Sequence, residues 1–497
     1  MNNYVLGIDL GTSSLKGLLI SKDGKVVATS SSDYCVIHPK AGFSEQDPQE
    51  WINAAKNVIK QILTKVPSAK TNIEAISFSG QMHSLVLLDK NDKPVRNAIL
   101  WNDVRTTKEC LYITEKLGKD LIKITKNRAL EGFTLPKILW VMLNEPNVWK
   151  KVCCFLLPKD YLGFWFTGNK QMEFSDAAGT LLLDIEKKIW SSRIAKTFDI
   201  SKNLYPKLVN STDKIGIIKK EIAKELGIEN EIPLYAGGAD NACAAVGSGI
   251  TLENVGLCSI GTSGVFLSYE SSTIKDYGGR LHFFNHVVKD CYYSMGVTLS
   301  AGNSLNWFKK TFADNLSFEE LLKGIDDIAI GSDNLLFTPY LVGERTPYAD
   351  SQIRGSFIGM DVNHTISHFT RAVVEGITFS LKDSMEIMQK DAGKKFERIV
   401  SVGGGAQNKN WLQIQADIFN STITTLTIEQ GPSLGAAMIA AVGVGWYKDF
   451  KSCADKFVSF GDVFQPNQKR AEKYKDVYEL YKQVYPSTRG ICKNKIG

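Results

Sequence analysis

The chain has 497 residues, of which 43% are hydrophobic and 23% are charged, and its formal net charge is +6. This is the composition of an ordinary globular protein and excludes long disordered or low-complexity tracts. The basic surplus, 59 Lys and Arg against 53 Asp and Glu, is spread along the chain and does not indicate nucleic-acid binding. One core rarely serves more than about 250 to 300 residues, so at least two domains are expected.

The nine cysteines favour a reducing compartment. Their spacings are irregular, and the only close pair, Cys153 and Cys154, lacks the two-residue gap of a redox or zinc motif. No run reaches about 18 uninterrupted apolar residues, and no basic segment with a long apolar run precedes the strand expected from Tyr4. We therefore expect a cytoplasmic protein without a signal peptide or a membrane span.

The first predicted element is a β-hairpin. Residues 5–8 and 15–20 are β-forming runs, and the segment 9–14 between them reads Asp-Leu-Gly-Thr-Ser-Ser. Glycine tolerates a tight turn, and successive backbone N–H groups with Thr and Ser hydroxyls can donate hydrogen bonds to phosphate oxygens. The turn is therefore a candidate phosphate site.

A helix and a strand follow the hairpin. Asp47 as N-cap, proline at position 48, Glu50 as the capping-box residue and apolar side chains at helical spacing predict a helix over about 48–64. Residues 73–78 read as a strand, which places His83 near a strand end, where α/β proteins bind their ligands.

Later segments of the chain repeat this pattern of a strand followed by a turn and a helix. Residues 233–236 read as a strand that delivers Asp240 to a strand end or to the first turn of a helix. Residues 398–402 read as a strand, a turn of three glycines follows, and Asn408 is a predicted helix N-cap. A strand, a glycine turn and a helix in this order suit a nucleotide. Another helix is expected to start at residues 431–433.

The phosphate turn occurs twice. Residues 259–264, Ser-Ile-Gly-Thr-Ser-Gly, repeat the phrase of residues 9–14 and are also flanked by β-forming runs. Two such hairpins predict two related domains, 1–248 and 249–497. The copies differ at one position, because the first carries Asp9 where the second carries Ser259. A carboxylate beside a phosphate turn fits the oxygen ligands that Mg²⁺ requires in phosphoryl transfer, although Asp and Gly are also ordinary turn formers.

Two further candidates have structural alternatives. Asp240 could be a general base that accepts the proton of a substrate hydroxyl, or simply the N-cap of the helix that follows it. His83 with Met82 could contact a polyol, since a neutral imidazole both donates and accepts hydrogen bonds, but an isolated His is more often structural. The glycines at 403–405 could serve a nucleotide or only tight helix–strand packing.

Taken together, the motifs are similar to those of the FGGY carbohydrate kinases over essentially the whole chain. The phrases that carry the resemblance are Gly7–Ser13, Gly80–His83, Ile99–Asp103 with Arg105 and Thr106, Gly132–Thr134 with Pro136 and Lys137, Leu157–Leu162, Ser175–Thr180, Gly238–Asn241, Gly261–Gly264, Gly343–Pro347 and Gly403–Asn408. The resemblance implies an α/β fold of two actin-like, ribonuclease H-type domains that hold sugar and ATP in the cleft between them.

The resemblance also implies site residues and partners. The implied activity is ATP-dependent phosphorylation of D-xylulose at its 5-hydroxyl, with ribulose, gluconate or glycerol as alternative substrates and an actin-like nucleotide switch or a silent sugar-binding regulator as more distant ones. The expected partners are the ketose and ATP, neither nucleic acid nor membrane, with a homodimer left open. The implied residues are Asp240 and Asp9 for catalysis, Asp9 for Mg²⁺, Met82, His83, Asp240 and Asn241 for the sugar, and Gly11, Thr12, Ser13, Gly261, Thr262, Gly404, Gly405 and Asn408 for ATP.

The chain departs from the family pattern at two positions. Ser84 stands where glycine usually follows the Met-His pair, and Ala239 stands where glycine usually precedes the Asp. Neither removes a reacting group. The added side chain of Ser84, next to the sugar-contacting pair, is expected to influence which ketose fits.

Overall fold

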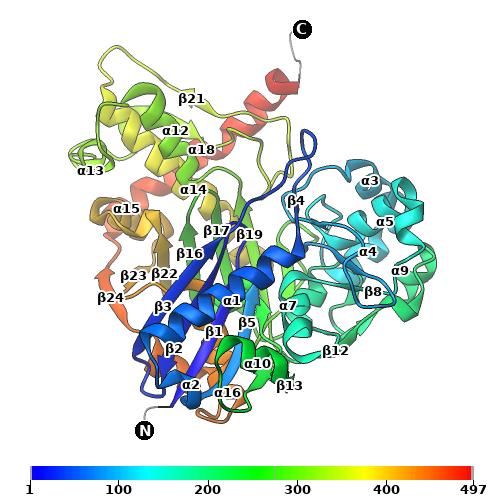
Figure 1. Cartoon of the computed structure of the whole chain (residues 1–497). Coiled ribbons are helices and arrows are strands. Elements are labelled where there is room, and N and C mark those ends of the chain that lie inside the picture. The colour runs from blue at the N-terminus through cyan, green and yellow to red at the C-terminus, as the bar shows by residue number, and fades with distance from the viewer. Residues whose placement is uncertain (1–2, 274, 494–497) are drawn as a thin grey trace.

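The computed structural model describes residues 3–273 and 275–493, and it contains two seven-stranded sheets (Figure 1). The first has the order β13 (Lys214–Ile217), β14 (Pro233–Tyr235), β5 (Ile73–Gly80), β1 (Tyr4–Leu10), β2 (Ser14–Ser21), β3 (Val26–Asp33), with β15 (Gly238–Ala239) also on β5. The second has the order β18 (His282–Asn285), β19 (Tyr292–Thr298), β17 (Gly264–Glu270), β16 (Val255–Ile260), β22 (Arg398–Gly403), β23 (Thr422–Leu426), β24 (Phe460–Phe464).

The two sheets are built around the two predicted hairpins, which are confirmed. β1 pairs antiparallel with β2 and parallel with β5, and β16 pairs in the same way with β17 and β22. Each turn is closed by a glycine N–H, from Gly11 to the carbonyl of Ser14 and from Gly261 to that of Ser263, both at 3.0 Å. The repeated sequence therefore marks a repeated arrangement of strands.

Helix α1 (Pro48–Lys65) confirms the predicted helix and covers one face of the first sheet. Its contact with β2 is close, because a Cβ at Gly17 would lie 2.5 Å from Val58 Cγ1. The capping box expected from Glu50 is not formed. The Asp47 carboxylate accepts the N–H of Gln49 instead, and Glu50 accepts a hydrogen bond from the Asn53 side chain.

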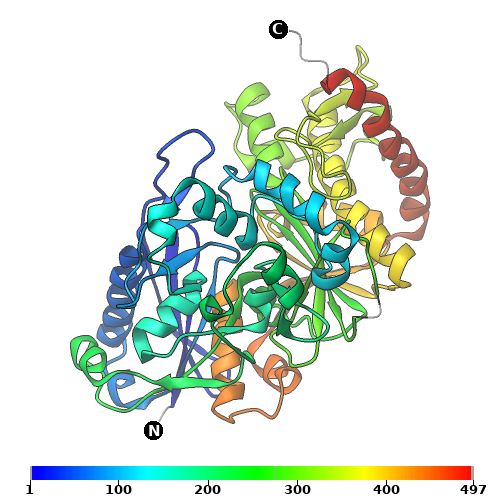
Figure 2. The same cartoon turned by 90° about the vertical axis from the view of Figure 1, so that its right-hand side faces the viewer.

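The opposite face of the first sheet is covered by helices from both halves of the chain. Helix α16 (Gly431–Gly443), which starts where the sequence predicts, packs on β1, since a Cβ at Gly7 would lie 2.2 Å from the Ser433 carbonyl oxygen. It crosses α11 (Asp240–Gly247), where a Cβ at Gly435 would lie 2.0 Å from the Cys243 carbonyl oxygen. Figure 2 shows the orange helices α16 and α17 (Phe450–Phe457) beside the blue strands. Helix α16 of the second half thus covers the first sheet, and α17 packs on α16.

The remaining helices form two groups. Beside the first sheet lie α2 (Ala69–Asn72), α3 (Thr107–Leu117), α4 (Lys119–Thr125), α5 (Thr134–Asn144), α6 (Pro146–Trp149), α7 (Pro158–Thr167), α8 (Phe174–Ala178), α9 (Ser192–Thr197) and α10 (Lys220–Leu226). With the second sheet lie α12 (Gly302–Phe312), α13 (Phe318–Leu322), α14 (Ile366–Ala392), α15 (Lys409–Phe419) and α18 (Gln468–Lys493). No helix in the described ranges is long and apolar enough to span a membrane.

Small two-stranded sheets complete the fold. They pair β4 (Glu45–Gln46) with β7 (Ala98–Ile99), β6 (Val86–Leu88) with β8 (Cys154–Leu156), β9 (Gln171–Glu173) with β12 (Lys207–Val209), β10 (Leu183–Asp184) with β11 (Ile189–Trp190), and β20 (Leu336–Thr338) with β21 (Ser356–Ile358).

Candidate active site

A cavity of about 170 Å³, called the sugar cavity below, brings together the four residues predicted to contact a sugar. Met82 and His83 follow β5, while Asp240 and Asn241 open α11. Both halves of the chain supply the rest of the wall. The other lining residues are Trp101, Leu130, Gly132, Phe133, Ser263, Val265, His282, Met295, Val297 and Arg345.

His83 is held in a fixed orientation and is neutral. Its backbone has a φ of 67°, in the left-handed region, and its carbonyl accepts the hydroxyl of Thr134 at 2.9 Å. Ring Nδ1 lies 2.6 Å from the carbonyl oxygen of Gly179 and must donate to it. Burial lowers the pKa of His83 to about 3. The neutral ring with a proton on Nδ1 leaves Nε2 free to accept a hydrogen bond from a hydroxyl.

Asp240 is the first residue of α11, and its carboxylate has the properties of a general base. The N-cap position is held by Ala239, and Asp240 accepts hydrogen bonds from the backbone and side-chain nitrogens of Asn241 at 2.7 and 2.9 Å. It therefore does not cap the helix. Burial raises the pKa of Asp240 to about 7, and the negative charge of Asp9 contributes to the rise. A carboxylate that titrates near neutral pH is suited to accepting a proton.

Asp9, at the end of β1, has a buried oxygen without a partner. Burial raises the pKa of Asp9 to about 6, against the opposing effects of the Ser79 hydroxyl and the Lys16 charge. Among the described residues, Asp9 Oδ1 and Ser79 Oγ accept or donate no hydrogen bond. No group of three or more His, Cys, Asp or Glu in that part of the chain could hold a metal alone. A Mg²⁺ bound here would therefore take its other ligands from water and phosphates, as Mg²⁺ commonly does.

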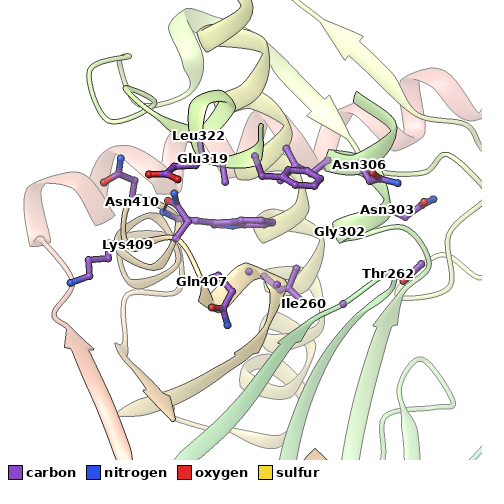
Figure 3. A pocket seen from close by; sticks show the side chains of 17 residues that line it. Ile260, Thr262, Gly302, Asn303, Asn306, Glu319, Leu322, Gln407, Lys409 and Asn410 are labelled. Atoms are coloured by element: carbon purple, nitrogen blue, oxygen red, sulfur yellow. Dashed lines mark hydrogen bonds between the residues drawn. The ribbon is translucent and has the colours of Figure 1, made fainter. Parts of the chain in front are cut away.

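A second cavity of about 860 Å³, called the nucleotide cavity below, lies in the second half of the chain (Figure 3). Gly261, Thr262, Gly404, Gly405 and Asn408, all predicted for ATP, line it. In the view of Figure 3, Thr262 and Asn303 lie at one side and Lys409 and Asn410 at the other. Apolar surface for a planar base comes from Ile260, Leu305, Phe318, Leu322 and Trp411.

The turn of the second hairpin lies between the two cavities. Thr262 lines the nucleotide cavity, and its neighbour Ser263 lines the sugar cavity together with Asp240. A phosphate chain that reaches this turn is therefore next to the sugar cavity. Gly11, Thr12 and Ser13 do not line the nucleotide cavity, because they form the turn of the other hairpin. The hydroxyl of Thr12 accepts the indole N–H of Trp101 at 2.9 Å, which links that turn to the sugar cavity.

Asn408 is confirmed as the N-cap of α15, since its side-chain oxygen accepts the N–H of Trp411 at 3.0 Å. Its side-chain NH₂ group remains available to a ligand.

The expectation for Ser84 is not supported. Its hydroxyl is fully buried, accepts the backbone N–H of Trp101 and points to Gln81, and Ser84 does not line the sugar cavity. The extra side chain therefore fills protein interior rather than ligand space.

The Gly404 and Gly405 pair offers a test of the nucleotide cavity. A Cβ at Gly404 would meet only the Ile260 carbonyl oxygen, at 3.6 Å, whereas one at Gly405 would lie 2.6 Å from Ile260 Cδ1. We expect Gly404→Leu to raise the KM for ATP about tenfold or more without changing the melting temperature, because the side chain enters the cavity. Gly405→Leu should lower the melting temperature. An unchanged KM for ATP in Gly404→Leu would contradict this placement.

A cluster of four buried charged side chains anchors the segment that precedes Asp240. Lys159 Nζ lies 2.6 Å from Asp160 Oδ1, 3.1 Å from Asp176 Oδ2 and 3.6 Å from Glu173 Oε1. Glu173 in turn accepts the hydroxyl of Ser175 at 2.6 Å. That hydroxyl accepts the N–H of Ala239, the residue before Asp240, at 2.9 Å. The cluster thus anchors β15 and the start of α11.

We expect Lys159→Met to cost about 3 to 5 kcal/mol of folding free energy, because three buried carboxylates lose their cation. Burial raises the pKa of Asp160 to about 7, and that of Asp176 is also raised. Raised pKa values mean that the carboxyls become neutral as the pH falls, so the deficit should be smaller at pH 5 than at pH 8. Denaturant unfolding at both values measures it.

A matched control is Lys187→Met, in which an exposed lysine loses its ion pair with Asp184 at 3.2 Å. Exposed pairs contribute at most about 1 kcal/mol, so this variant should unfold like the wild type. If Lys159→Met lowered the free energy of unfolding equally at pH 5 and pH 8, the charge cluster would not be the cause of the destabilisation.

Sequence reasoning assigned no role to several lining residues. Trp101 and Arg345 lie in phrases that carry the family resemblance, but neither was predicted to contact a ligand. His282 lies on β18 and no motif surrounds it. Only the pairing of β18 with β19 and the packing of the second half against Phe133 bring it to the cavity.

Comparison with known proteins identifies the family. Residues 4–247 match the N-terminal domain, and residues 256–444 the C-terminal domain, of the FGGY family of carbohydrate kinases. The chain belongs to the FGGY family of carbohydrate kinases. A xylulose kinase of Lactococcus lactis is 56% identical over 98% of this chain and 97% of its own length.

Solved structures agree with this FGGY kinase in fold. The ligand-bound xylulose kinase of Lactobacillus acidophilus has a TM-score of 0.94 at 29% identity and covers 98% of both chains. A gluconate kinase of the same organism has a TM-score of 0.93 at 29% identity, with the same coverage. The expected α/β fold of two actin-like domains is confirmed, and the protein is an ATP-dependent carbohydrate kinase.

Proposed function

We propose that this FGGY kinase transfers the γ-phosphoryl group of ATP to the 5-hydroxyl of D-xylulose, which yields D-xylulose 5-phosphate and ADP. The observation that carries the proposal is the position of the second hairpin turn, which lines both the nucleotide cavity and the sugar cavity. The choice of D-xylulose is supported by the relative named as a xylulose kinase, which is 56% identical along nearly the whole chain.

Asp240 would act as the general base. Its carboxylate accepts the proton of the 5-hydroxyl while that oxygen forms a bond to the γ-phosphorus, and the bond from the γ-phosphorus to the β–γ bridging oxygen breaks to release ADP. Asn241 holds one carboxylate oxygen of Asp240 through two hydrogen bonds, which leaves the other oxygen for the substrate. Nε2 of His83 would accept a hydrogen bond from another sugar hydroxyl, and Met82 would contact the carbon chain.

The turns would bind the phosphates and Asp9 would serve the metal. Thr12 and Ser13 in the first turn and Thr262 in the second offer backbone N–H groups and hydroxyls, while Gly11 and Gly261, whose N–H groups close the turns, would let the phosphates approach the backbone. Gly404, Gly405 and Asn408 would contact the adenosine. The unpartnered buried oxygen of Asp9 fits a Mg²⁺ ligand. When bound, Mg²⁺ neutralises phosphate charge.

The domain boundary near residues 248 and 249 and a location in the cytoplasm belong to the same proposal. The boundary separates the strands of the two sheets but not the helices, because α16 packs on β1 and α17 packs on α16. All nine cysteines, each of which lies in the described ranges, are free thiols, as is usual in a reducing compartment. A homodimer stays a prediction.

A panel of D-xylulose, D-ribulose, D-gluconate and glycerol, assayed by coupled ADP release, tests the substrate. The proposal expects the highest kcat/KM for D-xylulose. A clear preference for another member would overturn the substrate, and ADP release that does not depend on any sugar would favour a nucleotide switch. Phosphorylation of any sugar would exclude the alternative that the protein is a catalytically silent sugar-binding regulator.

A further inference from the structure

Arg345 is a cation in the wall of the sugar cavity for which the proposed chemistry has no use. It is partly buried and lines the cavity with His83 and His282. Within residues 3–273 and 275–493, its guanidinium makes no hydrogen bond and has no carboxylate within 4.0 Å. Burial lowers its pKa, although Glu131 and Glu344 act in the opposite direction. A guanidinium with five donors and no protein acceptor is available to a ligand.

The backbone of Arg345 is fixed against β19. The buried carboxylate of Glu344 accepts the N–H of Arg345 at 2.7 Å and that of Leu299 at 3.1 Å, and its other oxygen accepts the hydroxyl of Thr298 at 2.5 Å. The next residue, Thr346, donates its N–H to Val297 at 3.0 Å. Val297 itself lines the sugar cavity. Arg345 is thus part of a rigid wall, as a recognition residue should be.

Arg345 lies on the His282 side of the sugar cavity, because these two residues also line a small neighbouring cavity that Asp240 does not line. Burial lowers the pKa of both His83 and His282, and the positive charge of Arg345 lowers both further. The charge that acts on Asp240 is that of Asp9. A ketopentose bound with its 5-hydroxyl at Asp240 would place its other end, with the C2 carbonyl and the C1 hydroxyl, on the side of Arg345.

We propose that Arg345 binds the end of the substrate opposite the phosphorylated hydroxyl and gives the sugar cavity affinity for a sugar acid as well as for the neutral ketose. The inference rests on the proposed function, because that function sets the orientation of the sugar. A guanidinium binds a carbonyl or hydroxyl oxygen by single hydrogen bonds, but a carboxylate by two parallel charged ones. D-xylonate keeps C3 to C5 of D-xylulose and carries a carboxylate at C1.

Calorimetric binding of D-xylonate to the full-length protein, with xylitol as the neutral probe, tests the proposal. D-xylonate should bind the wild type, bind Arg345→Gln at least about tenfold more weakly and bind Arg345→Lys with intermediate affinity. The same substitutions should change the affinity for xylitol less than the affinity for D-xylonate. For D-xylulose, Arg345→Gln should raise KM more than it lowers kcat. Arg193→Gln, which removes an exposed arginine paired with Asp120 at 3.5 Å, should match the wild type.

Three results would overturn the inference, two from D-xylonate binding and one from D-xylulose kinetics. One binding result is equal D-xylonate affinity in wild type and Arg345→Gln with matched melting temperatures, and the other is no D-xylonate binding to the wild type at millimolar concentration. D-xylulose phosphorylation with an unchanged KM in Arg345→Gln also contradicts it while leaving the proposed function intact. Arg345-dependent D-xylonate binding in a protein that phosphorylates no ketose would support the acid site and count against the proposed function.

Discussion

Replacement of Asp240 by asparagine is expected to lower kcat for D-xylulose by about 10² to 10⁴ and to leave ATP binding nearly unchanged. Asparagine keeps the size of the side chain but cannot accept the proton of the 5-hydroxyl. Steady-state ADP release and calorimetric ATP binding measure the two quantities. An equal loss of ATP affinity would mean that Asp240 supports the nucleotide cavity rather than the chemistry.

The pH dependence of the wild type provides a second measure of the same residue. Only the ionised carboxylate is a base, and burial with the nearby Asp9 charge raises its pKa to about 7. We therefore expect kcat to fall about tenfold per pH unit below pH 7. The groups that face Asp240 are Asp9, Asn241 and Tyr293. A flat profile between pH 5 and pH 8 would contradict its role as base.

Asp240→Asn should also make the protein more stable at high pH. The folded pKa of about 7 exceeds the ordinary value of 3.8, so ionisation costs folding free energy as the pH rises between these values. The variant avoids this cost. Its melting temperature should match the wild type near pH 4 and exceed it above pH 7. A lower melting temperature at pH 8 would show that Asp240 is structural.

Replacement of Asp9 by asparagine should lower kcat by about 10² to 10³, because the carboxylate proposed to hold Mg²⁺ loses its charge. The unpartnered Oδ1 of Asp9 is the structural reason for this expectation. Nucleotide binding provides a separate readout. Mg²⁺ should strengthen ATP binding to the wild type, and this strengthening should be reduced in Asp9→Asn.

The repeat itself supplies the control for Asp9. Ser259 occupies the equivalent position on β16, pairs with Val402 on β22 and brings no carboxylate to its turn. Ser259→Ala should therefore retain activity close to that of the wild type. If Asp9→Asn retained the wild-type response to Mg²⁺, or if Ser259→Ala were equally impaired, the asymmetry of the two turns would have another cause.

The parts of the molecule that the sequence predicts well are those whose physics is local. The two hairpins follow from β-forming runs around a glycine turn, α1 follows from helical spacing behind Asp47, and the cap of α15 follows from Asn408. Even here, the choice of capping partner was wrong for Glu50, because two competing local hydrogen bonds differ by little free energy.

The candidate site could be predicted only in part. Met82, His83, Asp240 and Asn241 share one cavity, as their position after strands suggests. Arg345 lies in a recognisable motif, yet nothing local to it shows that it lines a cavity whose walls come from both halves of the chain. The position of Ser84 was likewise not evident from the sequence, since it is next to His83 in the chain but does not line the sugar cavity.

By itself, the sequence determined the duplicated Gly-Thr-Ser turn, the difference between Asp9 and Ser259, and membership of the family. Only the tertiary structure decided that Thr262 and Ser263 line different cavities, that α16 packs on the first sheet, and that Arg345 lines one cavity with His83. The physical reason is the distance along the sequence over which each kind of interaction acts. Turn chemistry and periodicity act over a few residues, whereas these contacts join segments hundreds of residues apart and depend on how whole domains pack.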